Sequence, residues 1–301
     1  MITCLGLGPA LDVTYGVTRL HVGQIHRPTW AMSLPGGKSI NVARALHTLG
    51  VASRVIAPLG GAIGDSVRVG LEASGIASIV VPIAAETRLC VSIVDDHSGA
   101  STEVYDHPTV IDDSAWKGIL TAVEGVAGGW LAVSGSVPAA RRRDLGDALA
   151  GAVDRGVHLA LDVTGDVLTD ALVRAHPAVV KVNRDEAAEL LGDADARSLA
   201  RDLHAAGAAT AVVTDGAAGA IGVDPTGQWR ARPPVRGRFA IGSGDSFLAG
   251  LLSSLCAGPG LADALRAATA AGAANTLTPG AGCFSAADAS RFASDVTVTD
   301  A

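Results

Sequence analysis

Residues 242–250 read Gly-Ser-Gly-Asp-Ser-Phe-Leu-Ala-Gly, and an apolar, helix-like stretch continues from there to about residue 257. Glycines let a backbone turn tightly and approach a ligand closely. A helix that begins here has unpaired amide N–H groups and the positive end of its dipole at its start, so it can bind an anion. Asp245 lies among these amides as a carboxylate able to accept a proton. The pattern is typical of a phosphoryl-transfer site, although Asp245 could instead simply cap the helix.

A second glycine-rich stretch, Pro35-Gly36-Gly37-Lys38-Ser39-Ile40-Asn41, leads into a predicted helix over residues 40–49. It is not a P-loop, because the first glycine of that motif would fall at Met32. Lys38 and Asn41 lie in the first helical turn, where both could contact a bound ligand. A solvated lysine is the alternative, but a cation is unfavourable at this end of the helix dipole, so we favour ligand contact.

Short apolar segments alternate with helix-like segments along most of the chain. The predicted strands cover residues 2–7, 55–59, 79–82, 130–133, 158–161, 179–182 and 211–214. The predicted helices cover residues 66–74, 114–126, 141–155, 184–191, 195–206 and 261–277. Such alternation predicts an α/β fold with a doubly wound, mostly parallel sheet flanked by helices, which binds ligands at the carboxyl ends of its strands.

Two pairs of short alternating segments depart from this pattern. One pair lies around residues 15–17 and 25–32, and the other covers residues 89–94 and 102–105. They predict antiparallel strands, and hence a small β-sheet lid inserted as about residues 14–34 and 88–106. We expect residues 1–301 to form a single domain, whose tail is frayed from about residue 295.

Polar residues recur where the predicted parallel strands end. They are Asp12, Ser134, Ser136, Asp162, Asn183 and Thr214. Thr214 begins a turn between two strands, and the glycines at 216 and 219 would permit close approach of a nucleotide. Asn183 and Glu186 share one face at the start of a helix. Glu186 could order water around Mg²⁺, or it could simply be a favourable first-turn charge.

The composition excludes several classes of protein. The chain has 301 residues, 49% hydrophobic and 18% charged, and a net charge of −7, which argues against binding to nucleic acid or to anionic membranes. Four scattered cysteines without C-x-x-C spacing predict reduced thiols in a cytoplasmic protein. We interpret the N-terminus as a first strand and not as a signal peptide, and no apolar run is long enough to span a bilayer.

Together these stretches resemble the ribokinase-like (phosphofructokinase-B) carbohydrate kinases nearly end to end. Residues 242–247 resemble the family's C-terminal signature, and residues 36–43 resemble its N-terminal one. The match is closest to the branch of 1-phosphofructokinase, tagatose-6-phosphate kinase and the minor 6-phosphofructokinase. The residues that resemble this branch are Pro9–Asp12, Lys38, Glu86–Arg88 and Ser134–Pro138.

The resemblance implies a role for each matching residue. Asp245 would deprotonate the accepting hydroxyl, and the amides of Gly242, Ser243 and Gly244 would bind the transferring phosphoryl group. The substrate would be held by Asp12, Gly36, Gly37, Lys38, Asn41, Arg88, Ser136 and Arg27, of which Lys38, Arg88, Ser136 and Arg27 would bind its existing phosphate. The nucleotide would be held by Lys181, Asn183, Thr214, Gly216, Gly219 and Asn275, with Glu186 binding Mg²⁺ through water.

The implied reaction is ATP-dependent, Mg²⁺-requiring transfer of a phosphoryl group to a hydroxyl of a ketohexose monophosphate, with help from a monovalent cation left open. The implied partners are the phosphosugar, ATP and a second copy of the chain, paired through the lid. The chain departs from the family pattern at Gly8, Ser39, Val182, Asp215 and residues 105–109. The last of these departures borders the sugar site and bears most on the substrate.

Three other functions are open to test. One is a kinase of the same fold that acts on an unphosphorylated sugar or a nucleoside. Another is a sugar-phosphate sensor without catalytic activity. The third is a dinucleotide-dependent oxidoreductase, which is disfavoured because Gly6-Leu7-Gly8 is followed by Leu11 where the fingerprint needs a third glycine.

Overall fold

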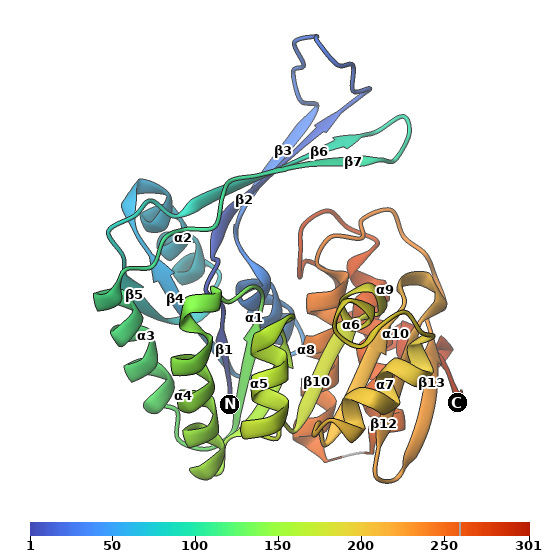
Figure 1. Ribbon diagram of the computed structural model, residues 1–301. Coiled ribbons are helices and arrows are strands. Elements are labelled where there is room, and N and C mark those ends of the chain that lie inside the picture. The colour runs from blue at the N-terminus through green and yellow to red at the C-terminus, as the bar shows by residue number, and fades with distance from the viewer. Residues whose placement is uncertain (259) are drawn as a thin grey trace.

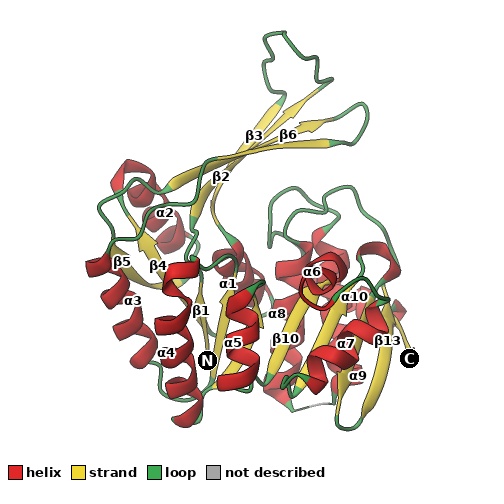
Figure 2. Cartoon of the chain, in the orientation of Figure 1, coloured by secondary structure: helices red, strands yellow, loops and turns green. Residues whose placement is uncertain are grey.

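The computed structural model describes residues 1–258 and 260–301, whose strands form a large and a small sheet (Figures 1 and 2). Along the large sheet the strand order is β14-β13-β12-β11-β10-β9-β8-β1-β4-β5. The parallel strands are β1 (Ile2–Leu5), β4 (Ser53–Leu59), β5 (Ala77–Pro82), β8 (Trp130–Ser134), β9 (His158–Asp162), β10 (Val179–Asn183) and β11 (Thr210–Thr214). Three strands pair antiparallel at one edge, namely β12 (Ala220–Asp224), β13 (Gly227–Arg232) and β14 (Thr297–Asp300). The predicted mostly parallel α/β sheet is confirmed.

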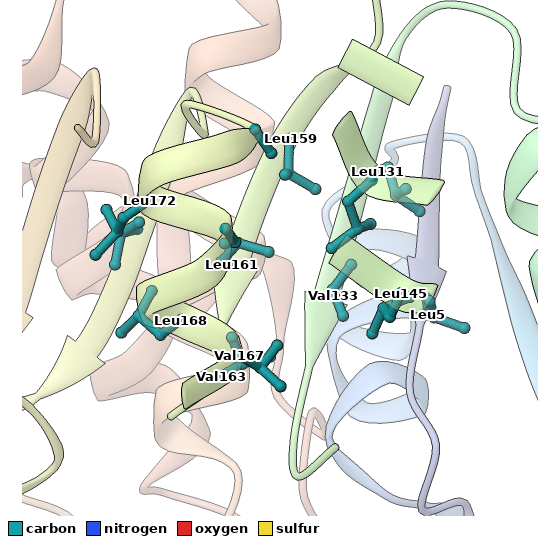
Figure 3. Packing of buried hydrophobic residues seen from close by; sticks show 14 of the residues in the cluster. Leu5, Leu131, Val133, Leu145, Leu159, Leu161, Val163, Val167, Leu168 and Leu172 are labelled. Atoms are coloured by element: carbon teal, nitrogen blue, oxygen red, sulfur yellow. The ribbon is translucent and has the colours of Figure 1, made fainter. Parts of the chain in front are cut away.

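Helices cover both faces of the large sheet. One face packs against α3 (Asp113–Glu124), α4 (Arg142–Asp154), α5 (Asp166–Arg174), α6 (Arg184–Leu191) and α7 (Ala196–Ala205). The other packs against α1 (Lys38–Thr48), α2 (Gly61–Ala73), α8 (Ser243–Ala257), α9 (Leu261–Asn275) and α10 (Ala286–Asp295). Because side chains alternate along a strand, Leu131 and Val133 join the first layer, whereas Ala132 joins the second (Figure 3). The sheet is therefore doubly wound, as predicted.

The parallel strands bring the polar residues noted in the sequence to one edge. Ser134, Asp162, Asn183 and Thr214 are the last residues of β8, β9, β10 and β11, which are neighbours in the sheet. Their side chains therefore follow one another along the carboxyl edge, where ligands collect in sheets of this kind.

The small sheet projects from this same end of the molecule (Figure 1). Its order is β3-β2-β6-β7, with β2 (Ala10–Val17), β3 (Trp30–Gly36), β6 (Arg88–Asp95) and β7 (Ser101–Tyr105). The predicted hairpins are present, but β2 begins at Ala10 and β3 begins only at Trp30. Asp12 consequently lies inside β2 and not at the end of the first strand, because Gly8-Pro9 is only a short break between β1 and β2.

The expected fraying of the C-terminus is wrong. Thr297–Asp300 forms β14, which pairs antiparallel with β13 over residues 229–232. The side chain of Val296 is buried against the second helix layer, and Val298 packs beside it, so alternation fixes the strand. In the part of the chain that the structure describes, no helix is long and apolar enough to cross a bilayer.

Candidate active site

The turn before α8 is shaped to approach a ligand. Gly242 has a φ of 78°, a left-handed conformation that favours glycine, and a Cβ there would lie only 2.4 Å from Ala281. The Ser243 N–H donates to the Ala240 carbonyl at 3.1 Å, so this amide is already used within the turn. The amides of Gly242 and Gly244 have no hydrogen-bond partner among the described residues, and they are the donors that the turn offers to an anion.

Asp245 lies in the first turn of α8 and is buried, with 7% of its surface exposed. Burial, reinforced by the nearby carboxylate of Asp162, raises the pKa of Asp245 to about 6. A hydrogen bond from Asn41 Nδ2 to Asp245 Oδ2 at 2.9 Å, together with the charges of Lys181 and Lys38, opposes this shift. Asp245 is therefore a carboxylate with the raised pKa of a general base, and it does not act as a simple N-cap, since α8 has no side-chain cap.

Two lysines and the carboxylate of Asp162 lie next to Asp245. Asp162 is fully buried, and its carboxylate is 3.4 Å from Lys181 Nζ and 3.6 Å from Lys38 Nζ. Lys38 Nζ also lies 3.6 Å from Glu186 Oε1. A Cβ on Gly244 would be 3.1 Å from Lys181 Nζ, so this ammonium group borders the start of α8. The site thus combines positive charge with free amides, as an anionic phosphate requires.

Asn183 and Glu186 form a capping box at the start of α6. The Asn183 side chain accepts from the Glu186 N–H, and Glu186 Oε2 accepts from the Asn183 N–H, each at 2.8 Å. The other oxygen of Glu186 faces Lys38. No group of three or more acidic, histidine or cysteine side chains in the described part of the chain could hold a metal ion alone. These residues fit a Mg²⁺ ion that is bound mainly by phosphates and water.

Two cavities meet at the turn before α8. The first has a volume of about 290 Å³ and is lined by Thr214, Gly216, Gly219, Ser243 and Gly244, with Val235, Phe247 and Ala273 as apolar wall. A Cβ on Gly219 would lie 2.0 Å from the Ala231 carbonyl, so the turn after β11 needs glycine there. A long pocket with an apolar wall and a glycine-lined, donor-rich end suits a nucleotide.

The second cavity, about 200 Å³, lies beneath the small sheet. Its lining includes Asp12, Ser92 and Tyr105 from the small sheet, and Arg44, Arg238 and Ala281 from the body of the protein. Ala240, in the loop before Gly242, lines both cavities. Gly36 packs against Asp12, because a Cβ there would be 2.1 Å from the carboxylate. A hydroxyl-bearing molecule in the second cavity would therefore face a nucleotide in the first.

Of the predicted site residues, four lie elsewhere than expected, namely Lys38, Arg27, Ser136 and Asn275, whereas Arg88 lies beside the second cavity. Lys38 contacts the carboxylates on the nucleotide side and does not line the second cavity. Arg27 is exposed in the loop between β2 and β3, at the far end of the small sheet (Figure 1). Ser136 is exposed and lines neither cavity. Asn275 is fully buried and lines neither cavity, and its amide is used in hydrogen bonds with Ser246, Ile241 and Gly282. Arg88 donates to the Gly8 carbonyl at 3.0 Å beside the second cavity.

Three functional candidates were not assigned a role from the sequence. Asp162 stood out only as one polar residue at the edge of the sheet, and its contacts with Lys38 and Lys181 depend on the fold. Arg44 and Arg238 line the second cavity. Arg44 lies one helical turn after Asn41, which was a usable signal, whereas nothing local marks Arg238.

Comparisons with known proteins agree with this geometry. A 1-phosphofructokinase of Bacillus subtilis (strain 168) is 27% identical over 287 residues, covering 92% of this chain and 93% of that protein. The ATP-dependent 6-phosphofructokinase isozyme 2 of Escherichia coli (strain K12) is 29% identical over 288 residues, with 93% of each covered. Solved structures of phosphofructokinase-2 from Escherichia coli, in complex with substrates and products and in complex with potassium, are 27% identical to this chain. They cover 98% of each chain and superpose with TM-scores of 0.92 and 0.91. The sequence pattern of the pfkB family carbohydrate kinases matches residues 12–287, and the chain belongs to that family.

Proposed function

We propose that the protein transfers the γ-phosphoryl group of ATP to a hydroxyl of a ketohexose monophosphate, as a 1-phosphofructokinase, a 6-phosphofructokinase or a tagatose-6-phosphate kinase does. The observation that carries the proposal is Asp245, a buried carboxylate of raised pKa in the first turn of α8, directly after the turn that borders both cavities. Membership of the pfkB carbohydrate kinase family supports the same reaction.

The chemistry asks three things of this chain. Asp245 accepts the proton of the attacking hydroxyl, which makes the oxygen a better nucleophile. The free amides of Gly242 and Gly244 stabilise the charge that gathers on the phosphoryl oxygens during transfer. Lys181, whose ammonium borders Gly244, adds a charge-assisted donor on the same side. The small sheet covers the acceptor and keeps water from competing with it.

The nucleotide would bind in the first cavity, with its phosphates against Gly244 and its base against the apolar wall. Glu186 and Asn183 would orient water around Mg²⁺, which would supply positive charge that offsets part of the negative charge of the phosphates. We reassign Lys38 to the phosphoryl group in transfer, because its ammonium lies between Asp162 and Glu186.

The phosphate already on the acceptor needs cations in or beside the second cavity. Arg88 is the best candidate, since its Nε is buried without a hydrogen-bond partner and its charge acts on Asp12. Arg238 lines the same cavity. The alternative is an unphosphorylated sugar or nucleoside, and it is favoured by the remote position of Arg27 and by the pairing of Lys38 with carboxylates.

We also propose a homodimer that pairs through the small sheet and works in the cytoplasm. The edge strand β7 is exposed over its whole length, and its Val104 and Tyr105 leave 60% and 52% of their surfaces in solvent. Exposed apolar edge strands favour pairing with another sheet. The four cysteines are unpaired, which fits a reducing compartment. Sedimentation of the wild type and Val104→Glu tests the dimer, and a wild-type monomer at assay concentration would refute it.

The function is tested by measuring ADP release with Mg·ATP and a panel of acceptors. The panel contains fructose 1-phosphate, fructose 6-phosphate, tagatose 6-phosphate, fructose and ribose. We expect one phosphosugar to give the highest kcat/KM, and Asp245→Asn to lower kcat about 10²–10⁴-fold. Asp263→Asn, which changes an exposed first-turn aspartate of the neighbouring helix α9, is the matched control. A free sugar as best acceptor would establish the alternative, and absence of turnover with every acceptor would refute kinase activity.

A further inference from the structure

The guanidinium group of Arg44 is buried at the centre of the site, although no step of the proposed reaction uses it. Arg44 lies in α1, one turn after Asn41, and only 8% of its surface is exposed. Its Nη1 donates to Asn41 Oδ1 at 3.1 Å and to the Ala281 carbonyl at 2.6 Å, and its Nη2 donates to the Pro35 carbonyl. One side chain therefore ties together the segment before Gly36, the amide of Asn41 and the loop that contains Ala281.

The bond to Asn41 decides which way that amide points. An arginine can only donate, so the atom of Asn41 that faces Arg44 must be the oxygen. The NH₂ group is then directed at Asp245 Oδ2, to which it donates at 2.9 Å. With the opposite orientation, the amide oxygen would face the carboxylate, which is favourable only when Asp245 is protonated.

Arg44 also supports the turn that offers the free amides. Ala281, whose carbonyl accepts from Arg44, packs directly against Gly242, where a Cβ would lie 2.4 Å away. Gly282 packs against Asn41 in the same way, since its Cβ would be 2.6 Å from the Asn41 carbonyl oxygen. The base and the anion-binding turn are thus held in register by contacts that converge on Arg44.

We propose that Arg44 is a positioning residue, which fixes the Asn41 amide so that it donates to the catalytic base and thereby keeps Asp245 ionised at neutral pH. The proposal rests on the proposed role of Asp245. Other charged groups that face Asp245 are Asp162 from β9, Lys181 from β10 and Lys38 from α1. Asp12 and Cys283 face Arg44 itself, and the charges of Arg44 and Asp245 also act on each other directly. None of these groups is changed by the variants below, so a shift in titration reports on Arg44 and Asn41.

The test is the acid limb of the pH profile of kcat, measured for the wild type, Arg44→Lys, Asn41→Ala and the double variant. Arg44→Lys keeps a positive charge but cannot make all three contacts. We expect its acid limb to move upward by about one pH unit, so that kcat falls about threefold at pH 6.5 and recovers above about pH 8.5. Asn41→Ala should move the limb similarly, and adding Arg44→Lys to it should move the limb no further.

The control is Arg266→Lys in α9. The Arg266 guanidinium lines neither cavity and donates to the Val296 carbonyl at a distance of 2.7 Å, so this variant should leave the acid limb in place. If Arg44→Lys does not fold, Arg44→Gln is measured instead. This variant also removes a charge that acts on Asp245, so its limb should move by about one pH unit or more, and only the part due to the lost charge should persist when Asn41→Ala is added. An unchanged limb, or a shift that adds in full to that of Asn41→Ala, would overturn the proposal. If Asp245→Asn keeps its activity, the assignment of Asp245 as the base fails. If Asp245→Asn is inactive but the acid limb of Arg44→Lys lies at the same pH as that of the wild type, only the role of Arg44 fails.

Discussion

Replacing Asp245 by Asn should stabilise the protein while it lowers kcat about 10²–10⁴-fold. The carboxylate is buried and faces Asp162, so the folded protein has to hold an unfavourable charge at neutral pH. Asn has nearly the same shape and no charge, and its side-chain oxygen can still accept from Asn41 Nδ2. The substitution therefore removes the electrostatic cost and leaves the packing intact.

The size of the effect follows from the pKa of Asp245, which is about 6 in the folded protein against a reference value of 3.8. At a pH between these two pKa values, the folded state keeps the proton of Asp245 whereas the unfolded state has lost it. The free energy of unfolding therefore falls as the pH rises from about 4, and it levels off above about pH 6. Two pKa units correspond to about 3 kcal/mol at pH 8, and about half of that at pH 5. Asp245→Asn should recover this energy.

Urea denaturation of the wild type, Asp245→Asn and the control Asp263→Asn, each at pH 5 and pH 8, measures the prediction. Asp245→Asn should raise the free energy of unfolding at pH 8 by about 2–3 kcal/mol and at pH 5 by roughly half as much. The control should stay within about 0.5 kcal/mol of the wild type at both values of pH. A loss of stability at pH 8, or a gain of equal size at both, would show that burial of the Asp245 charge is not what strains the site.

Three further predictions concern activity. In the wild type, kcat should fall about tenfold for each pH unit below about 6, because only the ionised Asp245 acts as a base; a profile flat down to pH 5 would contradict this. Gly36→Ala should raise KM for the acceptor about tenfold or more and leave KM for ATP nearly unchanged, because the new Cβ would lie 2.1 Å from the Asp12 carboxylate. Equal changes in both constants would instead indicate general misfolding. Arg238→Ala should increase ATP hydrolysis relative to sugar phosphorylation, because it removes a 2.8 Å bond from the body of the protein to Asp96 in the small sheet. The coupling ratio of ADP to phosphosugar measures this effect, and an unchanged ratio would show that the bond does not hold the cover in place.

Much of the fold follows from local sequence patterns. Strand-length apolar runs such as residues 130–133 alternate with amphipathic helices, and such runs can only be buried in a sheet covered on both faces. The polar residue that ends each run then has to lie at the carboxyl edge, which is why Asp162, Asn183 and Thr214 could be placed there in advance. The glycines of residues 242–244 similarly predicted a turn that comes close to a ligand.

What could not be predicted depends on contacts between distant parts of the chain. The tail after residue 295 is short, and its alternating Val296 and Val298 were too weak a signal until β13 offered an unpaired edge. The sequence around Asn275 looks the same whether this residue binds a nucleotide or supports a loop. Only the fold shows that its amide makes hydrogen bonds with three groups of the protein. The family resemblance assigned Lys38 to the acceptor phosphate, whereas in the structure its flexible side chain reaches the carboxylates of β9 and α6.

The electrostatics of the site supply an argument for catalysis that does not depend on resemblance to other kinases. Asp162, Lys181 and Asp245 each expose less than 10% of their surface and lie within one cluster. A buried ion pair generally adds little stability compared with well-packed apolar residues, and a second buried carboxylate beside it is unfavourable. Such an arrangement persists in a folded protein when chemistry requires it, since strongly shifted ionisable groups cluster at functional sites. If Asp245→Asn proves both more stable and inactive, the same measurement will have shown that the strain at this position serves proton transfer.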